Sequence, residues 1–327
     1  MRSNKTTAVV VTYNSAGKVG ACLEAALRYC ARVIVVDNAS RDGTRDEVRR
    51  LPAVQLIANA GNRGFAAAAN LGFVLAGTDY VLLLNPDCIL QGPVEELETA
   101  CMELDAAMCC GLLVHPDGSP QTGFAVRRLP QPSTLIFEAL GLNRVLPGNP
   151  VNQRYRCLDL DLSRPQPVEQ PAGAFLLIRR DAWRAIGGFD EEFYPLWFED
   201  VDFARRLAKR GGRVVLQPAV RALHSGGHSV ESLAPAQRQI YWYDNLLRYA
   251  AKHFNCMQFR MVCGAVAAGV AARMVTGIFT VGRDTPIAAF GKVALKAAAR
   301  FLAGPPSRQS PPAAARARRP GMFPAEG

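Results

Sequence analysis

Residues 80–87 read YVLLLNPD, a short apolar run that stops at an Asn-Pro-Asp sequence. Tyr80–Leu84 has the length and composition of a buried β-strand, and Pro86 ends such a strand because it has a fixed φ angle and no N–H to donate. An apolar run without alternating polar residues is typical of a parallel sheet that is covered on both faces. This stretch therefore predicts an α/β fold with a polar site immediately after the strand.

The rest of the chain repeats this pattern of apolar runs and helical spacing. We expect further strands at Thr7–Tyr13, Val33–Val36, Val54–Ile57, Met108–Val114, Gly173–Arg179 and Arg213–Gln217. We expect helices at Lys18–Ala31, Phe65–Ala76, Val94–Leu104, Asp200–Arg210, Ala236–His253 and Arg260–Thr280. Together they predict a mostly parallel sheet flanked by helices. Residues 127–171 are rich in Pro and lack periodicity, so we expect a functional loop or insertion there.

The positive charge of the chain is concentrated at its C-terminal end. The 327 residues carry 38 Lys and Arg against 28 Asp and Glu, a net charge of +10. Eight basic and two acidic residues lie in residues 283–327, which gives this segment +6 and leaves +4 for the rest. This distribution argues against nucleic-acid binding by the main body. Nine scattered Cys without a CxxC pair, and no secretory signal, favour a cytoplasmic protein.

One segment could contact a membrane. Met261–Gly282 approaches the roughly 20 apolar residues that cross a bilayer, but Arg273 interrupts it. We expect either a helix packed on the body or on a second subunit, or a peripheral contact in which the basic tail meets anionic lipid.

Two carboxylates stand at the ends of predicted strands, where ligands bind in open α/β sheets. Asp37 could accept a hydrogen bond from a nucleobase N–H, or it could cap the turn and helix that follow it. Asp87 could bind Mg²⁺ or Mn²⁺ together with substrate phosphates, or it could belong to a simple turn. The residues alone leave both alternatives open.

The segment FEDVDFARR (198–206) brings three more carboxylates together. Glu199 and Asp200 fall in the first turn of a predicted helix, whose dipole favours negative charge and would keep Asp200 ionised as a general base. Asp202 projects about 200° away from Asp200 and is expected to pair with Arg206. His224 follows a strand-like stretch and precedes two glycines, and a lone His in such a place is more often structural than a ligand.

The order of the motifs resembles that of family 2 glycosyltransferases, in particular the rhamnosyltransferase-like branch of bacterial surface polysaccharide synthesis. The resemblance covers about two-thirds of the chain, Thr6–Ser229. Its motifs are VVVTYNS (9–15), VVDNASRDGT (35–44), NAGNRGFAAAAN (59–70), YVLLLNPD (80–87), GAFLLIRR (173–180), GGFDEEF (187–193), FEDVDFARR (198–206) and His224. Asn85 replaces the first Asp of the family's DxD motif, which leaves one carboxylate there.

The resemblance implies a GT-A fold, in which a Rossmann-like nucleotide-binding half is fused to an acceptor-binding half. It places the catalytic domain at residues 1–255, with the nucleotide-sugar half at 1–115 and the acceptor half at 116–255. A helical, membrane-associated extension at 256–303 and a basic, disordered tail at 304–327 would follow. The implied site is a catalytic base, Asp200; nucleotide-binding Thr12, Tyr13, Asn14, Asp37, Asn62 and Arg63; metal-binding Asp87 and His224; and acceptor-side Trp197 and Glu199.

The implied activity is inverting transfer of a sugar, rhamnose from dTDP-rhamnose, to a hydroxyl of a glycan or lipid-linked acceptor, with Mg²⁺ or Mn²⁺ on the diphosphate. The expected place is the cytoplasm or the inner face of the cell membrane. One alternative is a sugar-nucleotide pyrophosphorylase, which would need a Gly-rich phosphate loop where this chain has TYNSAGK (12–18). The other is a non-catalytic scaffold that binds nucleotide sugars in a polysaccharide assembly complex.

Overall fold

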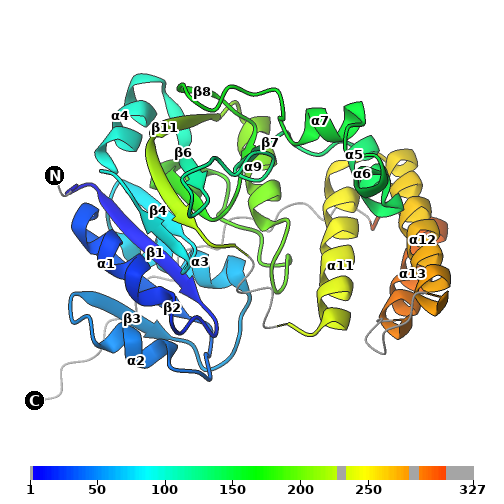
Figure 1. Ribbon diagram of the computed structural model, residues 1–327, viewed down its shortest axis with the longest axis horizontal. Helices are drawn as coiled ribbons and strands as arrows, with labels where there is room; N and C mark the ends of the chain where they lie inside the picture. Colours follow the sequence, from blue (N-terminus) through cyan, green and yellow to red (C-terminus); the bar gives the residue numbers. More distant parts are fainter. Residues whose placement is uncertain (1–2, 227–232, 280–286, 307–327) are drawn as a thin grey trace, which may run out of the picture.

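The computed structural model describes residues 3–226, 233–279 and 287–306, and most of the predicted basic tail lies outside these ranges (Figure 1). Nine strands of the described residues form one mixed sheet. Eight of them lie in the order β3 (Val54–Ala58), β2 (Arg32–Asp37), β1 (Thr6–Thr12), β4 (Tyr80–Leu84), β10 (Phe175–Arg179), β6 (Ala106–Val114), β11 (Arg213–His224) and β5 (Cys88–Leu90). The ninth, β8 (Gln166–Pro167), pairs with β11. A separate pair consists of β7 (Val126–Arg127) and β9 (Gln170–Pro171).

Six of the nine strands, β1, β2, β3, β4, β6 and β11, run in the same direction, as the sequence predicts for most of the sheet. β1 pairs in parallel with β2 and β4, β2 with β3, and β6 with β11. The exceptions are β10, which lies antiparallel between β4 and β6, and the short strands β5 and β8, which lie antiparallel to β11. The carboxyl ends of β1, β2 and β4 therefore meet at one edge.

Helices cover both faces of the sheet because successive side chains of a strand point to opposite sides. Ala8 and Val10 pack on one face with α1 (Val19–Tyr29) and α4 (Glu95–Glu103). Val9 and Val11 pack on the other with α3 (Phe65–Ala76), α8 (Arg180–Ala185) and α9 (Glu199–Lys209). The short α2 (Thr44–Arg49) follows β2. The two apolar clusters hold the polar strand ends in place.

A third apolar cluster lies outside this sandwich, in the helices at the right of Figure 1. It joins α5 (Pro132–Leu140), α11 (Pro235–His253), α12 (Cys256–Phe279) and α13 (Ile287–Ala303). The N-terminal part of α9 also contributes to it. The predicted boundary at residue 255 stays a prediction, and in the structure α12 packs against α5, α11 and α13.

The segment 127–171, expected to be a functional loop or insertion, contains short regular elements. This segment contains α5, α6 (Leu142–Val145) and α7 (Pro150–Tyr155), together with strands β7, β8 and β9. These elements have two to nine residues, which is too short to show a clear periodicity in sequence. Helix α5 nevertheless has a recognisable start, because Pro132 is its first residue and Gln131 and Thr134 form a capping box.

Candidate active site

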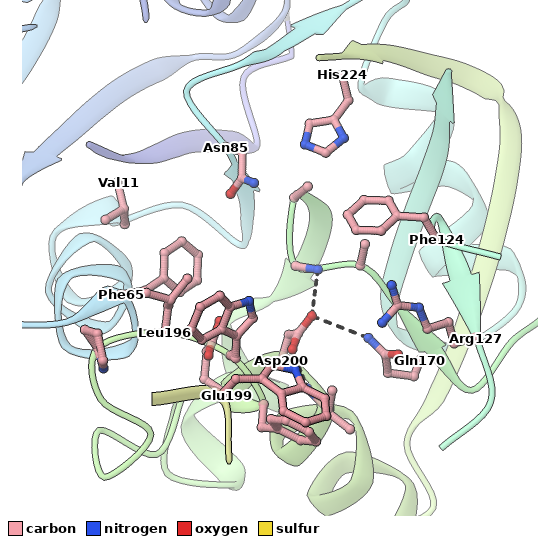
Figure 2. Close-up of a pocket in the computed structure, with 18 of the residues that line it drawn as sticks. Val11, Phe65, Asn85, Phe124, Arg127, Gln170, Leu196, Glu199, Asp200 and His224 are labelled. Atoms are coloured by element: carbon pink, nitrogen blue, oxygen red, sulfur yellow. Dashed lines mark hydrogen bonds between the residues drawn. The ribbon is translucent and has the colours of Figure 1, made fainter. Parts of the chain in front are cut away.

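A cavity of about 550 Å³ opens at the edge where β1 and β4 end, between the sheet, α9 and the segment around β7 and β9 (Figure 2). Both predicted halves contribute to its wall. Seven predicted site residues line it: Tyr13, Asn62, Asp87, Trp197, Glu199, Asp200 and His224. The four others, Thr12, Asn14, Asp37 and Arg63, are not among its lining residues.

Asp87 and His224 form a buried pair. The turn after β4 places the Asp87 carboxylate 3.6 Å from Nε2 of His224, at the end of β11. The other Asp87 oxygen accepts the backbone N–H of Gly226 at 3.0 Å. Ligand atoms of Asp87, Cys88 and His224 lie within 4.8 Å of one another, the one such cluster found among the described residues. The 3.6 Å between the Asp87 carboxylate and Nε2 of His224 is longer than a hydrogen bond, so the two groups could both bind a divalent cation.

Gln121, a residue the sequence did not suggest, fixes the tautomer of His224. Its Nε2 donates to the carbonyl oxygen of His224 at 2.7 Å, so its Oε1 is the atom that faces Nδ1 of the ring at 3.0 Å. Nδ1 must then carry the proton and donate it to Gln121, which leaves the lone pair of Nε2 facing Asp87. Burial lowers the pKa of His224 despite the nearby Asp87 charge. A neutral imidazole oriented in this way is the form that binds metals.

Asp200 lies at the opposite wall of the cavity, in the first turn of α9. One carboxylate oxygen accepts the backbone N–H of Gly173 at 2.9 Å and the other accepts that of Val201 at 2.8 Å. Burial raises the pKa of Asp200, although these hydrogen bonds and the charge of Arg127 act in the opposite direction. The direction differs from the effect expected of the helix dipole, because desolvation outweighs it. A raised pKa suits a general base.

Glu199 contributes a second buried carboxyl beside this base. Its Oε2 atom is buried and has no hydrogen-bond partner among the described residues. Burial, with a smaller effect from the Asp200 charge, raises the pKa of Glu199 well above its usual range. Two non-glycine residues with positive φ, Trp197 at 77° and Phe198 at 71°, precede α9. Such backbone is strained and is typically retained where a ligand site requires it.

Asp37 does not face the cavity. Its carboxylate is fully buried and accepts hydrogen bonds from Thr12 Oγ1, from the backbone N–H and hydroxyl of Ser40, and from Arg45 Nε. These four bonds occupy the acceptor sites of the carboxylate. They match the alternative in which Asp37 caps the turn that follows β2. Its role in holding a base stays a prediction.

Asn38 follows the end of β2, one of the polar strand ends that the sequence marks, but the sequence assigned it no role of its own. Asn38 lines the cavity, and its side chain joins the end of β2 to the loop before α3 through Gly64 and Asn59. Thr12 is held by Asp37, and the Asn14 side chain accepts the backbone N–H of Arg41. Arg63 is exposed. Other lining residues that no motif marked are Phe124, Arg127, Arg156 and Trp242.

Comparisons with known proteins identify the family of this chain. The profile described as "Glycosyl transferase family 2" matches residues 7–187. N-acetylglucosaminyl-diphospho-decaprenol L-rhamnosyltransferase of Mycobacterium tuberculosis (strain ATCC 25618 / H37Rv) is 33% identical over 243 residues, 68% of this chain and 76% of that protein. Rhamnosyltransferase WbbL of Escherichia coli (strain K12) is 26% identical over 183 residues, 54% of this chain and 63% of that protein.

Among solved structures, GalNAc-T7 with UDP, GalNAc and Mn²⁺ is similar in fold, with a TM-score of 0.54. It is 12% identical to this chain, and the match covers 91% of this chain and 56% of that one. The mixed sheet flanked by helices is therefore the expected GT-A fold. The chain belongs to glycosyltransferase family 2, as a hexosyltransferase similar to its rhamnosyltransferases.

Proposed function

We propose that this enzyme transfers rhamnose from dTDP-rhamnose, with inversion, to a hydroxyl of a glycan or lipid-linked saccharide. One observation carries the proposal: a single cavity is lined by the Asp87–His224 pair and by Asp200, and His224 and Asp200 lie on different sides of it in Figure 2. The donor's leaving group and the acceptor hydroxyl need such separate sites. The two rhamnosyltransferase relatives support the choice of donor sugar.

The residues of the chain fit one in-line displacement. Asp200 takes the proton of the acceptor hydroxyl while that oxygen attacks the anomeric carbon, and the bond from that carbon to the diphosphate oxygen breaks with its electron pair. Asp87 and the neutral Nε2 of His224 would hold Mg²⁺ or Mn²⁺ beside the leaving diphosphate. When bound, the ion would supply Lewis-acid stabilisation of the charge on that group. No enzyme nucleophile is required.

The proposal assigns the predicted site residues to a nucleotide side and an acceptor side of the cavity. Tyr13, Asn62 and the loop at Arg63 lie on the nucleotide side, with Thr12, Asn14 and Asp37 behind them as supports. Trp197 and Glu199 precede or begin α9 on the side of the base. Asn85 leaves one carboxylate in the turn, and His224 supplies the second protein ligand.

The test is transfer of labelled rhamnose from dTDP-rhamnose, with and without Mn²⁺. Asp200→Asn is expected to lower kcat by a factor of about 10² to 10⁴, the contribution of a general base, and to leave dTDP-rhamnose binding intact. Asp87→Asn is expected to abolish transfer, and added Mn²⁺ is not expected to restore it. Asp159→Asn, an exposed aspartate, is the matched control. An active Asp200→Asn enzyme would remove the base assignment.

The same assay addresses the two alternatives. A pyrophosphorylase would form dTTP from dTDP-rhamnose and pyrophosphate. A scaffold would bind dTDP-rhamnose without transferring the sugar or hydrolysing the donor.

We also propose a place for the enzyme at the cytoplasmic face of the membrane. Exposed apolar side chains, including Met257, Met261 and Leu302, gather where α12 begins and α13 ends. Arg260 donates to the carbonyl oxygen of Leu302, which shows that these helix ends are neighbours. A lipid-linked acceptor would make such a contact useful.

A further inference from the structure

Two arginines line the active-site cavity without pairing with its carboxylates. Arg127 comes from β7 and Arg156 follows α7, both in the segment for which the sequence predicted no regular structure. Four carboxyl side chains share the cavity wall: Asp87, Glu138, Glu199 and Asp200. Among the residues that the structure describes, neither arginine lies within 4.0 Å of a carboxylate oxygen. By contrast, the adjacent Arg128 pairs with Glu169 at 3.1 Å, outside the cavity.

Both guanidinium groups are held through their Nε atoms. Arg127 Nε donates to the carbonyl oxygen of Gly123 at 3.1 Å, and Arg156 Nε donates to Oδ1 of Asn152 at 3.0 Å. The Arg127 guanidinium also stacks near the rings of Phe124 and Tyr155, at 5.3 and 5.8 Å from their centroids. In the described part of the chain no hydrogen bond involves the terminal Nη atoms of either residue. Each side chain is therefore oriented in advance and presents unused donors.

The two arginines are neighbours and lie on the side of the base. A Cβ added at Gly123, which accepts the Arg127 bond, would lie 3.2 Å from Cβ of Arg156. Arg127 is close enough to Asp200 for its charge to lower the pKa of that carboxyl. In Figure 2 the Phe124 ring lies between Arg127 and His224, and this ring stacks on His224 at 5.4 Å. The arginines are thus separated from the Asp87–His224 pair.

This position assigns the arginines to the acceptor rather than to the donor. In an in-line displacement the acceptor approaches the anomeric carbon from the side opposite the leaving diphosphate, and the base stands beside the acceptor. A guanidinium presents a planar fork of donors that matches phosphate oxygens. Two neighbouring guanidinium groups match a ligand with two phosphates better than a ligand with one carboxylate.

We propose that Arg127 and Arg156 bind the diphosphate of an acceptor in which the saccharide is joined to a prenyl chain through a diphosphate. The inference rests on the proposed function, because it takes Asp200 as the base that defines the acceptor side. An acceptor of this class appears in the name of the Mycobacterium tuberculosis relative, and the inference assigns two residues of this chain to its diphosphate.

The experiment compares two acceptors that differ only in the anionic link, farnesyl-diphospho-N-acetylglucosamine and the neutral farnesyl glycoside of N-acetylglucosamine. The native enzyme is expected to show a KM for the diphosphate acceptor that is about 10- to 100-fold lower, as hydrogen bonds to a charged group imply. In Arg127→Gln and Arg156→Gln the ratio of the two KM values should fall toward one, mainly because KM for the diphosphate acceptor rises. Arg128→Gln is the matched control and should keep the native ratio. Rates are compared on the pH plateau, because Arg127 also affects the pKa of Asp200.

A second measurement separates this proposal from the proposed function. Binding of farnesyl-diphospho-N-acetylglucosamine is followed by the fluorescence of Trp197 and Trp242, which line the cavity, with EDTA and without donor. Binding that weakens in both arginine variants supports the subsite even if the enzyme transfers no rhamnose. The arginine subsite would be contradicted if KM and binding were unchanged in both variants, or if both variants lost affinity equally for the two acceptors. In that case transfer of rhamnose by the native enzyme would still support the proposed function.

Discussion

The tautomer of His224 is decided by a side chain that lies 103 residues away in sequence. Gln121 forms two hydrogen bonds with His224, one to its carbonyl oxygen and one to its ring. The sequence marked His224 as a ligand only through a family resemblance, and a lone His is more often structural. The structure supports the ligand role physically, since the ring is neutral, fixed and directed at Asp87.

Gln121→Leu is expected to weaken metal binding about 10- to 100-fold, the usual effect of losing a hydrogen bond that orients a metal-binding His. Activity should then require more Mn²⁺ and recover at saturating Mn²⁺, because the base Asp200 is untouched. The measurement is the rate of transfer against Mn²⁺ concentration. Gln153→Leu, an exposed residue of α7, is the control. An unchanged Mn²⁺ requirement in Gln121→Leu would contradict the orienting role.

At the scale of elements, α9 shows how much a local pattern can determine. The predicted pairing of Asp202 with Arg206 is confirmed, with 2.6 Å between Nε and Oδ2. The sequence did not indicate that α11 adds two more partners to the other oxygen, Lys252 at 2.8 Å and His253 at 2.7 Å. The carboxylate is completely buried, so α9 and α11 are joined through one charge.

This charge predicts a loss of stability in acid. Burial opposes ionisation of Asp202, but the hydrogen bond from His253 and the charges of Arg206 and Lys252 prevail and lower its pKa to about 2. Because the folded pKa lies below the unfolded value of about 3.9, the stabilisation is present above about pH 4 and is lost as the pH falls toward 2. It amounts to roughly 2–3 kcal/mol.

Asp202→Asn should lose about 3–5 kcal/mol of unfolding free energy at neutral pH, because it leaves the largely buried Arg206 guanidinium without its carboxylate, whereas Lys252 keeps Asp190. The variant should also lack this part of the acid dependence. Urea unfolding at several pH values, with exposed Asp159→Asn as control, measures both. Parallel pH curves for wild type and Asp202→Asn would show that another group is responsible.

The contact between α12 and α5 gives a prediction that depends on one glycine. A Cβ at Gly269 would lie 2.0 Å from the carbonyl oxygen of Ala139, whereas a Cβ at Gly264 would lie 3.8 Å from the Phe301 ring. Gly269→Ala should therefore destabilise the protein by about 1–3 kcal/mol through overpacking. Gly264→Ala should be neutral or stabilising, since Ala favours a helix by about 1 kcal/mol over Gly. Thermal unfolding compares them, and equal Tm values would contradict this packing.

At the scale of the whole molecule, α12 packs against α5, α11 and α13. It is the one described helix that is long and apolar enough to cross a membrane, and a third of its candidate window, Cys256–Val275, is buried against the protein. Arg273, which interrupts the apolar run in sequence, donates to Ala139 and to Tyr243. Truncation near Lys252 would expose the cluster shared by α5 and α11, so point variants test membrane contact better.

We expect the enzyme to float with vesicles that contain anionic lipid, because exposed apolar groups on α12 and α13 can enter the interface. The double variant Met257→Glu, Leu302→Glu should float less, because anionic lipid repels the two added negative charges. The two native side chains are 74% and 77% exposed. Val74→Glu changes an exposed apolar residue on α3 and is the control. Failure of the native enzyme to float, or equal losses in both variants, would contradict the contact.

The sequence by itself determined the alternation of strands and helices, the polar residues that follow β1, β2 and β4, and the motifs of the family. These features depend on periodicity and turn chemistry between neighbours in the chain. Only the tertiary structure decided that Asp37 faces Thr12, Ser40 and Arg45 instead of the cavity, and that Gln121 orients His224. It also decided that Arg127 stands beside Asp200. Hydrogen-bond geometry and desolvation depend on neighbours in space, which local sequence patterns do not encode.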